Sequence, residues 1–202
     1  MDLYEYERAA WEGGFSAICG VDEAGRGPLA GDVYAAAVIL PRGVEIEGVN
    51  DSKKLSEKKR ERLYDEITGK ALAWCVATAS VEEIDALNIL QASLLAMRRA
   101  VAGLAVRPDL ALVDGNQDPR FPEVRCRTIV GGDGKSASIA AASILAKVSR
   151  DRYMKELGER YPQYRFDKHK GYGTKLHYEL LERYGVSPVH RRTFLKKLTG
   201  GG

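Results

Sequence analysis

The side chains best suited to chemistry in this sequence are four carboxylates, each of which follows a short apolar run. They are Asp22, Glu23, Asp114 and Asp133. In open α/β sheets, ligands bind outside the carboxyl ends of the strands, so we expect these carboxylates to converge at one edge. Carboxylates after strands are also common turn residues, and each position taken singly fits that simpler interpretation.

Clustered carboxylates repel one another and are costly to desolvate, and a divalent cation relieves both costs. Oxygen donors without cysteine or histidine favour Mg²⁺ or Mn²⁺ over zinc. Two such ions about 3.5 to 4 Å apart activate water and stabilise the leaving oxygen in phosphodiester cleavage. Neighbouring strand residues face opposite ways, so Asp22 and Glu23 share a site only if the strand ends before them. Gly25 and Gly27 favour such an end.

Two glycine-containing segments resemble nucleotide-binding loops without matching them. In segment 25–31 the third glycine is one residue late for a dinucleotide-binding loop, and a strand rather than a helix is expected to follow. Segment 134–136 ends like a phosphate-binding P-loop, but residue 129 is isoleucine where the first glycine is required. What remains is a simpler phosphate site, in which Ser136 and the first amides of the following helix bind the anion and Lys135 assists.

Positive charge is concentrated towards the C-terminus. Residues 165–197 contain nine Lys and Arg against three Asp and Glu, and they also contain all three histidines. Such asymmetry predicts a polyanionic partner, with phosphates contacted by Lys168, Lys170, Lys175, Arg191 and Arg192. Tyr172, among these basic residues, suits stacking against nucleic acid, although a core position is equally compatible with the pattern. We expect His169 to be exposed and to contact phosphate or solvent rather than to act as a general base.

The elements that must position these residues follow from apolar periodicity and from turn and cap residues. Strands are expected at 17–21, 33–40, 72–79, 110–113 and 125–130, and helices at about 3–12, 56–68, 81–85, 88–103, 135–159, 174–184 and 193–198. Strands interleaved with helices predict an α/β fold with a mixed five-stranded sheet. The alanines within 140–146 would let the long helix approach the sheet closely. We expect one structural domain, with residues 1–164 as the catalytic core and 165–202 as a basic helical subregion packed on it.

Composition excludes several classes of protein. The 202 residues are 45% hydrophobic and 29% charged, with a formal net charge of +3, which rules out a disordered tail, a collagen-like repeat and a coiled coil. No apolar run approaches the ~18 residues that cross a bilayer, and the acidic N-terminus lacks the basic region of a secretory signal. Three widely separated cysteines favour reduced thiols and a cytoplasmic location.

Several motifs occur in an order that resembles one family. Residues 20–31, Gly-Val-Asp-Glu-Ala-Gly-Arg-Gly-Pro-Leu-Ala-Gly, resemble the opening signature of bacterial ribonuclease HII. Further matches lie at 50–55, 113–115, 132–136, 141–148 and 169–174, so that the resemblance extends from about residue 17 to residue 194. It implies a ribonuclease H-like fold with a helical C-terminal subregion. It also implies metal-dependent cleavage of the RNA strand of RNA–DNA hybrids, and incision 5′ to single ribonucleotides in duplex DNA that leaves 3′-hydroxyl and 5′-phosphate ends.

The resemblance also implies roles for individual residues. The metal ligands would be Asp22, Glu23 and Asp114, with Asp133 completing the catalytic carboxylates and two Mg²⁺ or Mn²⁺ ions as cofactors. The segment Gly25-Arg26-Gly27 resembles the loop that reads the 2′-hydroxyl and the adjoining phosphate. Tyr172 matches the aromatic residue that packs on the sugar beside the scissile bond. Lys53 and Lys135, with Ser136, are expected to contact phosphates.

The expected partners are the RNA–DNA hybrid and ribonucleotide-containing duplex DNA. We expect no membrane association, no obligate protein partner and a monomeric state. Two alternatives remain open. One is a hybrid-binding protein with an inert acidic cluster, which metal-dependent turnover would exclude; the other is a ribonuclease that needs several consecutive ribonucleotides, which a duplex carrying one ribonucleotide would test.

Overall fold

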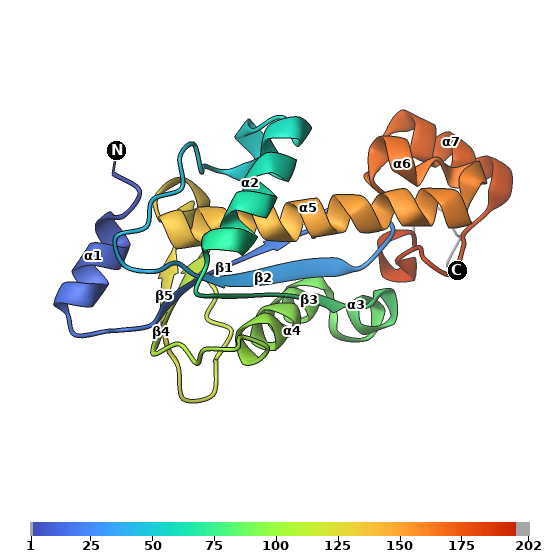
Figure 1. Ribbon diagram of the computed structural model, residues 1–202. Coiled ribbons are helices and arrows are strands. Elements are labelled where there is room, and N and C mark those ends of the chain that lie inside the picture. The colour runs from blue at the N-terminus through green and yellow to red at the C-terminus, as the bar shows by residue number, and fades with distance from the viewer. Residues whose placement is uncertain (1, 197–202) are drawn as a thin grey trace.

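The computed structural model describes residues 2–196, which form a five-stranded sheet with helices on both faces (Figure 1). The strands are β1 (Ile18–Ala24), β2 (Val33–Ile39), β3 (Ala73–Ala79), β4 (Leu110–Asp114) and β5 (Arg125–Ile129). The α-helices are α1 (Glu5–Glu12), α2 (Glu57–Lys70), α3 (Val81–Leu87), α4 (Ile89–Ala102), α5 (Ala137–Arg160), α6 (Phe166–His169) and α7 (Lys175–Tyr184). Short 3₁₀ turns lie at η1 (Ser52–Lys54), η2 (Gly132–Gly134), η3 (Pro162–Tyr164) and η4 (Arg192–Phe194).

The sheet is mixed, as its sequence pattern predicts. Its strand order is β3-β2-β1-β4-β5, with β2 antiparallel to its neighbours β1 and β3 and with β4 and β5 parallel to β1. Val21 of β1 lies opposite Val113 of β4. Because parallel neighbours end at the same edge of a sheet, this pairing places the carboxyl ends of β1 and β4 side by side.

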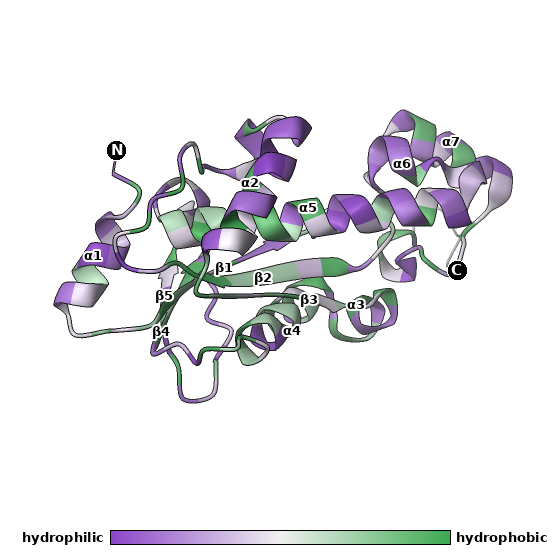
Figure 2. Ribbon diagram, viewed as in Figure 1, coloured by the Kyte–Doolittle hydropathy of each residue, from purple (hydrophilic) through white to green (hydrophobic). Residues whose placement is uncertain are grey.

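One face of the sheet packs against α4. Inward-facing residues of the central strands, among them Val21 and Ala35, form a core with Ala96 and Met97 of the helix. In Figure 2, β2 is coloured towards the hydrophobic end of the scale, whereas most of α2 on the outer surface is hydrophilic. Successive side chains of a strand point to opposite faces of the sheet, so these apolar strands supply an apolar surface to the helices on both faces.

The opposite face packs against α5, which runs along the sheet (Figure 1). The predicted close approach of this helix is confirmed, because Ala140, Ala141 and Ala142 are fully buried in the core that α5 forms with the sheet and α2. A methyl group built on Gly20 of β1 would lie 2.0 Å from the backbone carbon of Ser138. Any larger residue at position 20 would push the helix away from the strand.

The far end of α5 carries the C-terminal segments. Met154 and Leu157 pack there with Phe166, Leu181 and other apolar residues, and the same cluster includes Leu29 and Ala30 from the loop after β1. This cluster joins the C-terminal segments to the loop that follows the first strand. The division of the chain at residue 164 stays a prediction.

Some boundaries differ from those expected. The long helix starts at Ala137 rather than at residue 135, because the Ser136 hydroxyl caps it by accepting a hydrogen bond from the Ile139 amide. The expected helix at 193–198 is the single turn η4, and residues 197 and 198 lie outside the described part of the chain. Within residues 2–196, no helix has the length and apolarity needed to span a bilayer. The three cysteines are unbridged, with Cys19 buried and the other two partly buried.

Candidate active site

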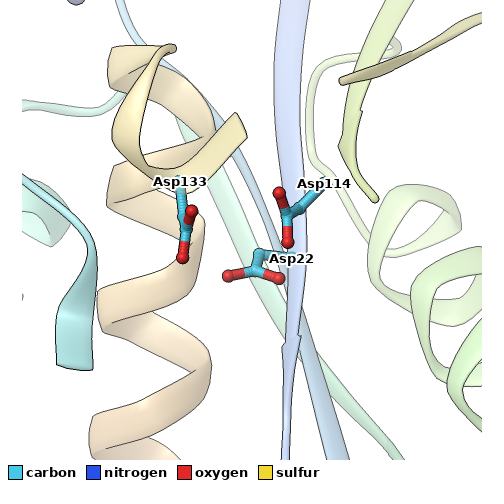
Figure 3. Close-up of side chains that lie close together, drawn as sticks. All are labelled: Asp22, Asp114 and Asp133. Carbon is cyan, nitrogen blue, oxygen red and sulfur yellow. The ribbon is translucent and has the colours of Figure 1, made fainter. Parts of the chain in front are cut away.

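Three aspartates converge at the carboxyl edge of the sheet (Figure 3). Asp22 comes from β1, Asp114 is the last residue of β4, and Asp133 lies in η2, just before α5. One carboxylate oxygen from each lies within 4.8 Å of the others. The parallel pairing of β1 with β4 and the 3₁₀ turn before α5 therefore produce the predicted convergence for these three carboxylates.

Asp22 is the most deeply placed of the three, with 4% of its surface exposed. Burial, together with the charges of Glu23 and Asp114, raises the pKa of Asp22 well above its usual value. Its Oδ1 accepts a 2.7 Å hydrogen bond from the Glu23 amide, and the Ser143 hydroxyl also donates to the carboxylate. Ser143 is held in turn by a 2.8 Å contact between its Oγ and that of Ser52.

Asp133 is also buried, and a lysine approaches it. Burial and the charges of Asp114 and Asp51 raise the pKa of Asp133. The Lys53 Nζ lies 3.8 Å from Asp133 Oδ2, on a side chain that is 80% exposed. Burial alone would lower the pKa of Lys53, but Asp133 and the neighbouring carboxylates raise it. The cluster is thus a concentration of negative charge that one exposed lysine offsets only in part, and such a cluster favours a cation.

Glu23 does not join the three aspartates, and the expected end of the strand before Asp22 is wrong. Strand β1 continues to Ala24, because its ladder with β2 extends through the pairs Glu23–Ala35 and Ala24–Tyr34. Consecutive residues of a strand face opposite ways, so Asp22 and Glu23 diverge. Glu23 instead lines a cavity of about 80 Å³ together with Arg26 and Asp114. Its carboxylate lies 3.5 Å from the Arg26 guanidinium, and burial raises its pKa although Arg26 opposes that rise.

The loop after β1 is held by a buried arginine from the C-terminal end of the chain. Arg191 is fully buried, and its guanidinium donates to the carbonyls of Gly25 at 2.6 Å, Arg26 at 3.1 Å and Pro28 at 2.8 Å. It also donates two hydrogen bonds to the Gly31 carbonyl. The expectation that Arg191 contacts phosphate is therefore wrong, because its donors point into the protein and are engaged with backbone.

A second buried arginine joins this loop to the segment that carries Tyr172. Arg150 of α5 donates to the carbonyls of Ala30 and Lys170, each at 3.1 Å. Its guanidinium lies 5.9 Å from the centre of the Tyr172 ring. Gly25 has φ +101°, and a methyl group built on it would lie 2.1 Å from Arg150 Nε. Only glycine accommodates both this backbone conformation and the arginine beneath it.

Tyr172 is 43% exposed, so the core position is excluded. A methyl group built on Gly27 would lie 3.7 Å from the Tyr172 ring, which places the ring in contact range of the loop after β1. The structure thus brings Tyr172 together with the segment Gly25-Arg26-Gly27. It places them next to Glu23, whose carboxylate faces Arg26.

The remaining predicted substrate contacts differ in accessibility. Lys135 donates from Nζ to the Val130 carbonyl at 2.6 Å, on an exposed side chain near Asp133. Ser136 is fully buried, and its hydroxyl donates to the buried Glu7 carboxylate at 2.6 Å. A phosphate contact by that hydroxyl requires the bond to Glu7 to break, so the structure assigns Ser136 first to the start of α5.

Comparison with known proteins identifies the family. The sequence model described as "Ribonuclease HII" matches residues 19–197, which is most of the chain. The chain belongs to the ribonuclease HII family. Ribonucleases HII are endoribonucleases, hydrolases that cleave the RNA strand of RNA–DNA hybrids.

Individual relatives agree with this assignment. The ribonuclease HII of Dechloromonas aromatica is 62% identical over 177 residues, which cover 88% of this chain and 90% of the relative. The crystal structure of ribonuclease H2 from Pyrococcus horikoshii superposes with a TM-score of 0.73 at 28% identity, over 88% of this chain and 93% of that one. A ribonuclease HIII, Bst-RNase HIII in complex with Mn²⁺, shares the fold with a TM-score of 0.70 at 18% identity, over 84% of this chain and 63% of that one.

Sequence reasoning missed several residues of this ribonuclease HII site. Asp51 contributes to the charge around Asp133, and Ser143 holds Asp22, although both lie in the segments that resemble the family. Arg150 and Arg191 carry no signal in the sequence, because an arginine in a polar stretch is normally exposed. The expectation that His169 is exposed is wrong as well, since it is 7% exposed and bonded on both ring nitrogens.

Proposed function

We propose that this ribonuclease HII is a divalent-metal-dependent endonuclease that also incises duplex DNA 5′ to a single embedded ribonucleotide. The products would carry 3′-hydroxyl and 5′-phosphate ends. The observation that carries the proposal is the joint placement of three converging aspartates, the glycine–arginine–glycine loop and the Tyr172 ring. A carboxylate cluster alone serves any phosphodiester, whereas the loop and the ring offer contacts to one particular sugar.

The aspartates fit a divalent cation by donor type and by charge. Asp22, Asp114 and Asp133 supply only oxygen ligands, which Mg²⁺ and Mn²⁺ prefer, and the raised pKa values of Asp22 and Asp133 report the cost of burying them and of keeping them near other carboxylates. When bound there, such ions supply activation of water and stabilisation of the leaving 3′-oxygen. Glu23 is proposed as a further ligand of these ions, although its side chain lies on the opposite side of β1 from that of Asp22. Lys53, beside Asp133, would neutralise part of the charge that an incoming phosphate meets.

The loop after β1 is proposed to read the 2′-hydroxyl with its amides. The carbonyls of Gly25 and Arg26 point at the buried guanidinium of Arg191. Because a trans peptide places its N–H opposite its C=O, the amides of Arg26 and Gly27 face the other way. These donors suit a 2′-hydroxyl or a phosphate oxygen, and a 2′-hydroxyl is what distinguishes RNA from DNA at one nucleotide. The Arg26 side chain would hold the neighbouring phosphate.

Other residues are proposed to bind the substrate less specifically. Tyr172 would pack against the deoxyribose beside the ribonucleotide, and Lys53 and Lys135 would contact phosphates near the scissile bond. Lys168 and Lys175 have side chains that are 61% and 92% exposed, and they would bind the backbone further along the duplex. We propose that the enzyme needs no protein partner, acts as a monomer and works in the cytoplasm.

Three duplexes of one sequence test this function. One carries a single ribonucleotide in DNA, one pairs a continuous RNA strand with DNA, and one is all DNA. The purified chain is expected to cut the first two with Mg²⁺ or Mn²⁺, to cut neither with EDTA, and to leave the third intact. Cleavage of the continuous hybrid alone would assign the enzyme to the type that needs several consecutive ribonucleotides, and metal-independent cleavage would contradict the role of the aspartates.

A further inference from the structure

The three histidines of this protein form a buried series of contacts that ends at Tyr172. We call His169, His177 and His190 the histidine relay; they are 7%, 0% and 1% exposed, respectively. The Nε2 atoms of His177 and His190 lie 3.0 Å apart. The rings of His169 and His177 are stacked, with their centres 4.1 Å apart and their planes at 15°. The activity of a ribonuclease HII assigns no task to these groups.

Backbone groups that cannot change their donor or acceptor role fix the position of each proton in the relay. The Ser187 amide donates to His190 Nδ1 at 3.0 Å, so that nitrogen carries no proton and His190 is protonated on Nε2. His190 Nε2–H therefore donates to His177 Nε2. His177 must then carry its proton on Nδ1, where it donates to the Tyr172 carbonyl at 2.9 Å.

His169 is fixed by the same reasoning and holds the preceding peptide. The Gly171 amide donates to His169 Nδ1 at 3.1 Å, so the proton of His169 is on Nε2, which donates to the Tyr164 carbonyl at 2.7 Å. Gly171 has φ +82°, and a methyl group built on it would lie 2.7 Å from the Ala30 carbonyl oxygen. Its own carbonyl accepts a 2.8 Å hydrogen bond from the Leu29 amide. The peptide before Tyr172 is thus held between the relay and the loop after β1.

The relay acts on the backbone of Tyr172, because the Tyr172 ring lies at the surface. The Tyr172 carbonyl accepts two hydrogen bonds, one from His177 Nδ1 and one from the Thr174 amide at 2.8 Å. The ring projects from this fixed backbone to the position beside Gly27. A small rotation of the peptide plane at Tyr172 would move the ring away from Gly27, since the ring stands several bonds from the carbonyl.

We propose that His177 is a positioning residue that sets the Tyr172 ring for ribonucleotide recognition through its Nδ1–H bond to the Tyr172 carbonyl, with His190 fixing the required tautomer. This role rests on the proposed contact of Tyr172 with the sugar. Burial lowers the pKa of both His177 and His190 to about 4, so the relay remains neutral and its proton order is unchanged at the pH of the cell. His177 does not touch the substrate.

The proton order is tested first, without reference to activity. Because the chain has three histidines, ¹⁵N imidazole spectra of the full-length protein contain three pairs of ring nitrogens. At neutral pH, His177 is expected to be the Nδ1–H tautomer, and His169 and His190 are expected to be Nε2–H tautomers. A His177 that carries its proton on Nε2, or on both nitrogens, would overturn the proposal.

Two substitutions separate the two hydrogen bonds of His177. In His177→Asn the side-chain N–H₂ replaces Nδ1–H and can still donate to the Tyr172 carbonyl, but the contact with His190 is lost. In His177→Gln the amide reaches towards His190, and the bond to Tyr172 is lost. Each variant removes one buried hydrogen bond, so both are expected to lose similar amounts of thermal stability, which makes them matched controls for folding.

The functional readout is the ratio of single-turnover cleavage rates at a single ribonucleotide and on a continuous hybrid. His177→Gln is expected to lower this ratio about tenfold, within the range that a 1 Å misplacement produces, whereas His177→Asn should stay within about twofold of wild type. In a Tyr172→Ala background, His177→Gln should change the ratio no further. An equal loss in both variants, or a further loss in the Tyr172→Ala background, would show that His177 acts on the fold or through another residue.

Failure of the proposed function gives a different result from failure of this inference. If the wild-type chain does not cut at a single ribonucleotide, the role of Tyr172 in recognition is wrong. The ¹⁵N spectra and the ring resonances of Tyr172 then still test the relay. His177→Gln should shift those ring resonances and His177→Asn should not; unchanged resonances in both variants would overturn the relay itself.

Discussion

The backbone amide of Gly132 donates a 2.6 Å hydrogen bond to Oδ1 of Asp114, which joins the end of β4 to the turn that carries Asp133. The carboxylate of Asp114 therefore has two tasks, one in holding the turn and one in the charge of the site. An asparagine at this position keeps an oxygen acceptor for Gly132 but loses the charge. The two tasks can be separated by substitution.

Asp114→Asn is expected to abolish cleavage while hybrid binding largely survives. Even changes beyond the direct ligands cost 10- to 100-fold at metal sites, so loss of a ligand charge should cost more than about a hundredfold. Affinity is expected to come mainly from lysine and arginine contacts with phosphates and should be retained. Cleavage assays with Mg²⁺ and binding assays in EDTA measure the two effects. Activity within tenfold of wild type would remove Asp114 from the proposed metal site.

Asp22→Asn is expected to raise the melting temperature of the metal-free protein. The raised pKa of Asp22 shows that burial and its acidic neighbours penalise its charge, and an amide of the same shape avoids that penalty. Thermal unfolding in EDTA tests the effect, with Asp118→Asn, an exposed position, as the control. A lower melting temperature for Asp22→Asn would mean that hydrogen bonds to Asp22 outweigh the repulsion.

Arg191→Lys is expected to destabilise the protein and to reduce cleavage at a single ribonucleotide. Lysine has at most three donors, without the planar fork of arginine, so some of the four carbonyls bound by Arg191 would be left unpaired. Losing one or more bonds to a charged donor should cost about 2 to 3 kcal/mol in free energy of unfolding. Arg192→Lys, an exposed neighbour, is the matched control in urea titrations and should change little.

Removal of two exposed lysines is expected to weaken hybrid binding and to flatten its dependence on salt. Lys168 and Lys175 are more exposed than Lys170, whose Nζ donates to the Asp167 carbonyl at 2.6 Å. If each contacts one phosphate, the double alanine variant should reduce the slope of log K against log salt by ~1.8. Binding titrations at salt concentrations from about 50 to 200 mM, the range over which phosphate contacts weaken affinity strongly, measure the slope. An unchanged slope would leave both lysines as solvated surface charges.

Stability is expected to fall as the pH drops below the usual histidine pKa of about 6.5. His177 and His190 have a pKa of about 4 in the folded protein, so the unfolded chain binds more protons between these values. Each histidine stabilises the folded protein by about 1.4 kcal/mol for each unit by which its folded pKa lies below its unfolded pKa. This stabilisation is complete above pH ~6.5 and is lost progressively as the pH falls towards 4. Urea unfolding from pH 7.5 to 4.5 checks this, with the histidine resonances followed in parallel. Titration of His177 and His190 near 6.5 in the folded protein would contradict it.

The sequence predicts the three converging aspartates of this site better than the buried residues that hold the surrounding loops in place. The convergence of Asp22, Asp114 and Asp133 follows from strand ends, because parallel strands finish at one edge whatever their exact lengths. The position of Glu23 does not, since β1 pairs with β2 for three residues beyond the expected strand end, and an apolar run does not report those pairs. The start of α5 is expected at about residue 135 but lies at Ala137, because the Ser136 hydroxyl caps the helix.

The buried polar groups are where sequence reasoning fails. The charge of residues 165–197 predicts an exposed basic surface, yet Arg191 and all three histidines of this stretch are buried. Their burial is possible because each finds hydrogen-bond partners. Backbone groups within five residues serve each histidine, whereas Gly25 and Gly31, whose carbonyls Arg191 binds, lie far from it along the chain. Nothing local to residue 191 signals those carbonyls, so its position could not be inferred without the fold.

The bond between Arg191 and Gly25 also orders events during synthesis on the ribosome. The chain emerges from its N-terminus, so the loop after β1 leaves the exit tunnel long before the residue that holds it. A nascent chain that has not yet reached residue 191 already contains all five strands of the sheet and its three aspartates. Its loop, however, remains without the guanidinium that fixes its carbonyls. The ribosome therefore adds the residues of the acidic cluster well before the arginine that fixes the loop after β1.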